Sequence, residues 1–279
     1  MWGSAMSRGH IIPIGGAEEK ELGPSILQRF VDVCGGGDAR LAVIPTASKL
    51  AETGPRYVEH FLQLGAAKAT SLPFEERIDC EREDWLAVLR EATGVFITGG
   101  NQLRLSTTIG GTPVAQLLRE RNATEGLTVG GTSAGASILS EHMIGYGDEG
   151  TTPRSDMLAL APGFGLTHEA IIDQHFQQRN RLGRLMTALA FNPRPIGIGL
   201  DEDTAAFIDP ADRLEVVGSG ALTILDPSGM EFSSMDSARR HEPLTIIGLK
   251  LHILTEGCTF DIPTRTAFHP ARAASPETA

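Results

Sequence analysis

The chain has 279 residues, of which 41% are hydrophobic, and this is enough apolar material for one large α/β domain or two small ones. Its formal net charge is −11 at pH 7 without a basic stripe, so we expect neither nucleic acid nor an anionic membrane as a partner. The three cysteines are widely spaced and form no C-x-x-C pair, which argues against a disulfide framework or a zinc knuckle.

Targeting and cofactor motifs are also missing from the sequence. Residues 1–10 contain no apolar signal-peptide core, and no apolar run approaches membrane-spanning length. The chain has no H-E-x-x-H, P-loop, complete G-x-G-x-x-G or EF-hand pattern. We therefore expect a cytoplasmic protein that uses no cofactor and no metal.

The first half of the chain alternates strand and helix. Continuous apolar runs predict buried strands, and apolar residues at helical spacing predict the helices between them. The predicted strands are 10–16, 40–48, 67–72, 94–100 and a segment ending at 133; the predicted helices are 24–34, 56–64, 81–92 and 102–121, the last interrupted at 110–113. This alternation is typical of a parallel sheet covered on both faces. Because sites form beyond the carboxyl ends of such strands, Gly15-Gly16, Gly99-Gly100 and Ser133 are expected to share one rim.

The second half changes character. Glycine and proline punctuate residues 146–165, which predicts a long loop. A strand at 170–175 and a helix to about residue 190 follow, and further strands are predicted at 195–209, 213–218, 221–226 and 244–254. We expect a mixed or antiparallel sheet edge here, within a single domain of residues 1–279 whose ends, 1–8 and 266–279, are flexible tails.

The segment 128–139 carries the clearest chemical signal. Its residues 131–135, GTSAG, form a G-x-S-x-G pattern between a strand and a helix. A serine on a tight strand-to-helix turn needs small neighbours, and the turn aims free amides of the helix start at an oxyanion. Ser133 is therefore a candidate nucleophile, and the alternative is a glycine-rich turn that merely joins the two elements.

A nucleophilic serine needs a base, and the base needs an acid that orients it. His175 ends an apolar strand, where a sheet would present it at the carboxyl rim, although a structural histidine is the alternative. Another apolar strand runs into Asp201-Glu202-Asp203, either a solvated turn or a source of the orienting carboxylate; these residues alone do not say which of the three would serve. The order serine, histidine, acid also differs from the order in α/β-hydrolases.

Three arginines, Arg179, Arg181 and Arg184, follow the candidate base. The last two fall in the first turns of a predicted helix, where the macrodipole disfavours cations. One interpretation is an anion-binding cluster beside His175 that suits substrate carboxylates. The alternative is a set of ordinary salt bridges.

Five blocks of the sequence resemble the cyanophycinase family of serine peptidases, which is related to the Asp-specific dipeptidase peptidase E. The blocks are IGGAE at 14–18, FITGGNQ at 96–102, GTSAGA at 131–136, DQHF at 173–176 and GLDEDTA at 199–205, and the arginine spacing and FDIPTR at 260–265 also match. The resemblance covers about residues 9–265. It implies an α/β/α three-layer sandwich around a mostly parallel sheet with antiparallel additions in the C-terminal half, of the class I glutamine amidotransferase-like kind, and a homodimer.

The resemblance also implies an activity: exopeptidase hydrolysis of cyanophycin, a polyaspartate with arginine on each side-chain carboxyl, to β-Asp-Arg dipeptides through an acyl-enzyme. By position, Ser133 is the nucleophile, His175 the general base and acid, and Glu202 the orienting carboxylate. The positions that match the substrate pocket are Gln102, Asp173, Gln174, Arg179, Arg181 and Arg184.

The mechanism further needs oxyanion donors, and we assign the amide of Ala134 and, as the second donor, that of Gly100. Each substrate repeat carries a carboxylate for the arginines, and Asp173 is hypothesised to bind its guanidinium. The alternative functions are an Asp-specific dipeptidase, or a non-catalytic amidotransferase-like binding protein in which Ser133 caps a helix over an anion.

Overall fold

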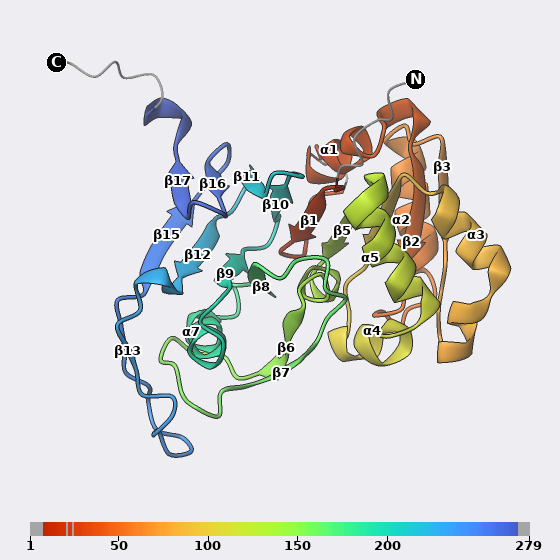
Figure 1. The fold of residues 1–279 in the computed structure, drawn as a ribbon. Helices are drawn as coiled ribbons and strands as arrows, with labels where there is room; N and C mark the ends of the chain where they lie inside the picture. The colour runs from red at the N-terminus through yellow and green to blue at the C-terminus, as the bar shows by residue number, and fades with distance from the viewer. Residues whose placement is uncertain (1–7, 21, 24, 273–279) are drawn as a thin grey trace.

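The computed structural model describes residues 8–20, 22, 23 and 25–272, and within them the largest sheet has nine strands (Figure 1). Five strands run parallel, in the order β1 (Ile11–Ile14), β5 (Thr128–Thr132), β4 (Gly94–Ile97), β2 (Arg40–Ile44) and β3 (Lys68–Ser71). Four antiparallel strands continue the sheet beyond β1, in the order β10 (Thr204–Ile208), β11 (Arg213–Gly218), β16 (Thr259–Asp261) and β17 (Thr266–Phe268).

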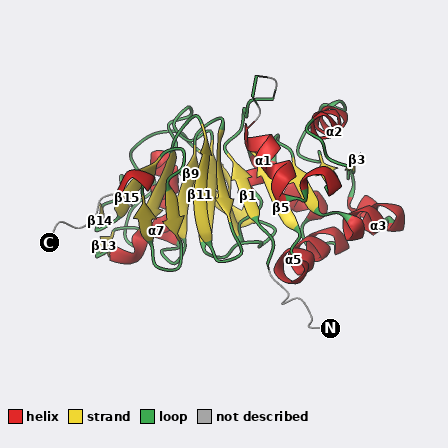
Figure 2. Ribbon diagram, turned by 90° about the horizontal axis from the view of Figure 1, so that it is seen from above, coloured by secondary structure: helices red, strands yellow, loops and turns green. Residues whose placement is uncertain are grey.

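Helices cover both faces of the parallel half, as the sequence predicts (Figure 2). The helices on one face are α1 (Ser25–Val33) and α2 (Thr53–Gln63); those on the other are α3 (Glu83–Glu91), α4 (Gln102–Ile109) and α5 (Pro113–Glu125). Alternate strand residues supply the two cores: Phe96 packs with α1 and α2, whereas Ile97 packs with the opposite helices.

A second sheet holds strands from the C-terminal half, in the order β15 (Lys250–Leu254), β12 (Leu222–Asp226), β9 (Ile196–Leu200) and β8 (Ala170–Gln174). Apolar residues of one face share a core with β10, β11 and β16, and the other face packs on α7 (Leu182–Phe191). The prediction of one strand over 195–209 was therefore wrong, because the chain leaves β9 at Asp201 and enters β10, in the other sheet, at Thr204.

Other boundaries also differ from the prediction. The expected loop at 146–165 instead contributes to an antiparallel ribbon of β6 (His142–Gly147) and β7 (Leu158–Pro162). The predicted strand at 244–254 contains β14 (Ile246–Ile247), paired with β13 (Phe232–Ser233), before β15 begins. The expected tail from residue 266 begins with strand β17, while residues 1–7, Pro24 and 273–279 lie outside the described part. Among the described helices, none is both long and apolar enough to cross a bilayer.

Phe96 is the centre of an aromatic cluster, with ring centroids 4.9 Å from Tyr57, 5.1 Å from Phe61 and 5.3 Å from Phe30. We expect Phe96→Ala to lower the free energy of unfolding by about 3–5 kcal/mol, because the substitution leaves a cavity between sheet and helices. Urea unfolding measures the change. Phe191→Ala is the control, since that ring is 49% exposed, and equal losses in the two variants would contradict the prediction.

Candidate active site

The carboxyl end of β1 organises the candidate site through three backbone hydrogen bonds. The carbonyl of Ile14 accepts from the amide of Ser133 at 2.9 Å, and the carbonyl of Gly15 accepts from His175 at 2.9 Å. The carbonyl of Gly16 accepts from Asp203 at 2.8 Å. Segments that follow β5, β8 and β9 therefore meet at one rim, although they belong to two different sheets.

Ser133 lies on a sharp turn between β5 and the short helix α6 (Ala134–Ser137), with φ 53° and ψ −113°. The flanking glycines have no room for a side chain. A Cβ on Gly131 would lie 2.2 Å from the carbonyl oxygen of Gly135, and a Cβ on Gly135 would lie 2.1 Å from that of Ile97. These contacts are the physical reason for the G-x-S-x-G pattern at this turn.

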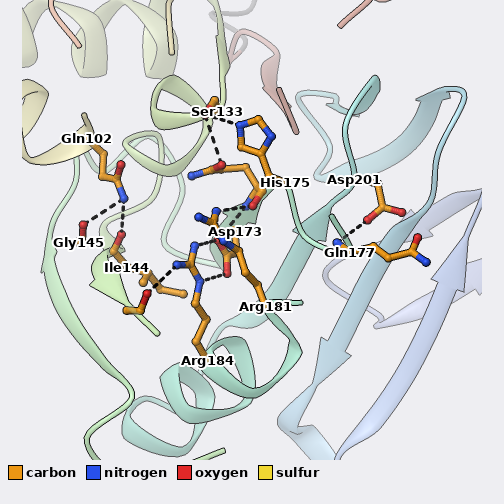
Figure 3. A network of polar contacts seen from close by, with 12 residues as sticks. Gln102, Ser133, Ile144, Gly145, Asp173, His175, Gln177, Arg181, Arg184 and Asp201 are labelled. Atoms are coloured by element: carbon orange, nitrogen blue, oxygen red, sulfur yellow. Dashed lines mark hydrogen bonds and ion pairs between the residues drawn. The ribbon is translucent and has the colours of Figure 1, made fainter. Parts of the chain in front are cut away.

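Ser133, His175 and Glu202 form a continuous hydrogen-bonded series, whose serine end is shown in Figure 3. Ser133 Oγ lies 2.9 Å from His175 Nε2, and His175 Nδ1 lies 2.7 Å from Glu202 Oε1. The neighbouring carboxylates have other partners: Asp201 accepts from the amides of Gln177 and Ala221, and Asp203 accepts from Ser219 Oγ. Of the three consecutive acids, Glu202 is the one that reaches the imidazole.

The imidazole of His175 packs directly on Gly16. A Cβ on Gly16, which has φ 103°, would lie 2.4 Å from His175 Cε1. Our sequence analysis placed Gly16 at the rim but gave it no role, and the glycine doublet that ends the first strand was the available signal. The absence of a side chain at this position allows the ring to approach the serine.

Burial lowers the pKa of His175 below its ordinary 6.5, and the positive charges of Arg179 and Arg181 lower it further. The hydrogen bond that His175 Nδ1 donates to Glu202 acts in the opposite direction and raises this pKa. The imidazole is therefore neutral at neutral pH and able to accept a proton. The carboxylate beside Nδ1 is placed to accept the N–H of the tautomer whose Nε2 faces Ser133.

Free backbone amides lie around the serine. Within the described chain, the amides of Ala134, Gly99 and Gly100 have no hydrogen-bond acceptor. A Cβ on Gly99 would lie 3.2 Å from Ser133 Cβ, so this glycine, which our sequence analysis left out, packs against the serine. Gly100 has φ 142°, and its Cβ position lies 2.1 Å from the carbonyl oxygen of Ala47.

The two predicted glutamines occupy different places. Gln174 is buried beside the serine, with its Oε1 3.4 Å from Ser133 Oγ. Gln102 begins α4 and donates from Nε2 to the carbonyls of Ile144 and Gly145, both at 3.1 Å, which ties α4 to β6 (Figure 3). Gln102 therefore holds one side of the site in place.

Two of the three arginines are buried against one carboxylate. Arg184 donates to Asp173 from Nε at 2.6 Å and also from Nη2, and Arg181 Nη1 lies 3.5 Å from the same carboxylate. Asp173 is 1% exposed, so it has no open face for a substrate guanidinium, and this arrangement corrects the hypothesis made for it above. Arg179 is exposed, with no ion partner in the described part of the chain.

Glu18 contacts the turn that carries Ser133. Our sequence analysis named it only as part of the block at 14–18 and gave it no role. Its carboxylate is 3% exposed and accepts from Thr132 Oγ1 and from the hydroxyl of Tyr57, while Lys20 Nζ lies 3.0 Å away. Burial and this carboxylate raise the pKa of Tyr57 well above 10. Glu18 thus fixes the residue that precedes Ser133.

A strained serine between a strand and a helix, hydrogen-bonded to a histidine, is typical of a class of hydrolases. Similarity to known proteins identifies the family. The sequence profile of peptidase family S51 matches residues 11–214. The chain belongs to this family and is a serine peptidase.

Curated relatives match nearly the whole chain. The cyanophycinase of Trichormus variabilis is 42% identical over 92% of this chain and 86% of its own length. That of Geminocystis herdmanii is 40% identical, covering 92% of this chain and 95% of its own.

Two solved structures share the fold. A peptidase from an acI-B1 actinobacterium has a TM-score of 0.69 at 22% identity, over 94% of this chain and all of the other. A putative peptidase E from Listeria monocytogenes has a TM-score of 0.51 at 16% identity, over 77% of this chain and all of the other.

Asp173→Asn should destabilise the fold strongly, because it leaves two buried guanidiniums without their shared carboxylate. Breaking a buried ion pair costs about 3–5 kcal/mol, and Asp173 and Arg184 are both nearly inaccessible. Urea unfolding provides the measurement. The control is Glu83→Gln, which removes an exposed ion pair with Arg90 and should change little. An Asp173→Asn protein as stable as this control would show that the cluster is not structural.

Proposed function

We propose that this serine peptidase is an exopeptidase of cyanophycin, multi-L-arginyl-poly-L-aspartate, and releases β-Asp-Arg dipeptides through an acyl-enzyme. The observation that carries the proposal is the hydrogen-bonded series from Ser133 Oγ through His175 to Glu202. The substrate is proposed because relatives named cyanophycinase are about 40% identical over most of this chain.

The reaction begins when His175 Nε2 accepts the proton of Ser133 Oγ and the oxygen attacks an aspartyl carbonyl. Glu202 stabilises the imidazolium that forms. The amides of Ala134 and Gly100 donate to the developing oxyanion, and each such donor contributes about 3–4 kcal/mol of transition-state stabilisation. The imidazolium then protonates the leaving nitrogen, and water hydrolyses the acyl-enzyme by the reverse proton transfers.

The substrate brings both charge signs, and the site offers an exposed cation for its carboxylate. Arg179, exposed beside His175, is proposed to bind the substrate carboxylate. Gln174 and Gln102 are proposed to lie along the path of the substrate to Ser133. The ion pairs of Asp173 with Arg181 and Arg184, and the hydrogen bond from Arg181 to the carbonyl of Gln174, fix the end of β8 and the segment after it. The homodimer, the cytoplasmic location and the glutamine amidotransferase-like class remain predictions.

Ser133→Ala should abolish dipeptide release and leave substrate binding intact. Loss of a nucleophilic serine of this kind lowers kcat by about 10⁶-fold. Purified cyanophycin is incubated with each protein and the soluble product is identified by mass. Ser237→Ala, at an exposed serine in the segment between β13 and β14, is the control and should keep full activity.

The same preparation tests the alternative functions. Release of aspartate from Asp-terminal dipeptides, without release of β-Asp-Arg from cyanophycin, would identify an Asp-specific dipeptidase. A non-catalytic binding protein would cleave neither substrate, and a serine-directed fluorophosphonate would label it no more than the Ser133→Ala protein.

The pH dependence of kcat/KM should report the lowered pKa of His175. The neutral imidazole is the active form and burial favours it, so activity should fall as the pH drops through a value below 6.5. Arg179→Gln removes a charge that lowers this pKa and should move the acidic limb upward, whereas Arg194→Gln, at an exposed arginine paired with Glu169, should not. An acidic limb at or above 6.5 in the wild type, or one that Arg179→Gln leaves in place, would contradict this assignment.

A further inference from the structure

A cavity borders the candidate site and is lined in part by the segment that follows His175. Its volume is about 380 Å³, within the range of small-ligand sites. Its lining includes Phe176, Arg181, Asp201, Thr223, Leu251 and Ile253. The first of these follows His175 directly and Asp201 precedes Glu202, so the two sites share their wall.

Asp201 supplies a buried negative charge to this cavity. The residue is 5% exposed, and its two carboxylate oxygens accept from the amides of Gln177 at 3.0 Å and Ala221 at 3.2 Å. In the described part of the chain no cation pairs with it (Figure 3 shows it apart from the arginine cluster). Because a carboxylate oxygen can accept more than one hydrogen bond, this group can still receive a cationic donor.

Arg181 supplies a buried positive charge. Its side chain is 8% exposed and shares the carboxylate of Asp173 with Arg184, so two guanidiniums face one negative charge. Its Nε has no hydrogen-bond partner among the described residues, and no ion pair there joins Arg181 to Asp201. A buried donor without a partner is costly, so the hydrogen-bonding capacity of this guanidinium is only partly used.

Part of the remaining wall is apolar. Leu251 and Ile253 lie on the same face of β15, 50% and 64% exposed, and Phe176 also lines the cavity. Such side chains can cover the methylene groups of a long cationic side chain. The cavity thus combines one anionic group, one cationic group and an aliphatic surface.

We propose that this cavity is a second subsite that binds a β-linked arginine of the polymer, beyond the two units that flank the scissile bond; this rests on the proposed function. Asp201 binds the guanidinium, Leu251 and Ile253 cover the methylenes, and Arg181 binds the free carboxylate of the same arginine. The flanking units occupy the Ser133 side of the shared wall, so only a longer substrate reaches across it. The subsite therefore makes the enzyme favour polymer over short fragments.

Charge substitutions at the exposed rim test this proposal without altering Asp201, whose carboxylate also holds two backbone amides. Leu251→Arg should repel the substrate guanidinium and raise KM for soluble cyanophycin by roughly tenfold. Leu251→Glu should leave that KM unchanged or lower it. Neither substitution should change the kcat or KM for the two-unit fragment (β-Asp-Arg)₂, which also verifies that each variant is folded.

Ile247→Arg is the matched control, because Ile247 is 49% exposed on β14 and does not line the cavity. A wild-type KM for polymer in Leu251→Arg, or an equal rise in Ile247→Arg, would overturn the subsite. Equal losses on polymer and on the two-unit fragment would overturn it as well. A wild-type protein that cleaves neither substrate would instead refute the proposed function.

Discussion

The carbonyl groups at the end of β1 are the constraint on which the candidate site depends. Three consecutive residues, from Ile14 to Gly16, accept hydrogen bonds from segments that are far apart in sequence and belong to two sheets. A side chain at Gly15 would lie 1.8 Å from the carbonyl oxygen of Asp201, and one at Gly16 would displace the imidazole. The close approach of His175 to Ser133 is therefore a property of backbone packing more than of either side chain.

Some charged side chains of the site are buried in ion pairs, whereas Arg179 is exposed to solvent. A buried charge loses its hydration, so it persists where a partner compensates it. The carboxylate of Asp173 neutralises the charge of Arg184 and in part that of Arg181. These ion pairs fix the segment that carries His175. Arg179, in contrast, stays exposed, and its positive charge adds to the effect of burial in lowering the pKa of His175. Of the three arginines that follow His175, two are therefore held against a buried carboxylate and one faces solvent.

Local patterns predicted much of this architecture, and tertiary contacts explain where they did not. Apolar runs and glycine stops mark the parallel strands because those signals act over a few residues. The choice of Glu202 over its two acidic neighbours is invisible in the residues themselves, since it depends on the directions that three adjacent side chains take after β9. The ribbon of β6 and β7 was missed because glycine and proline interrupt its apolar pattern, whereas its support comes from Gln102 and Arg184, which donate to carbonyls of β6.

Three residues of the site have a strained backbone conformation. Ser133, His175 and Asp203 all have positive φ, at 53°, 45° and 49°, a conformation that costs a non-glycine residue about 1–3 kcal/mol. Each of these residues donates its amide to the end of β1, so the hydrogen bonds that join the two sheets also hold the strained turns. The serine hydroxyl and the imidazole are in this way held in fixed positions by the backbone. Packing between the sheets consequently sets the distance between the hydroxyl of Ser133 and the imidazole of His175.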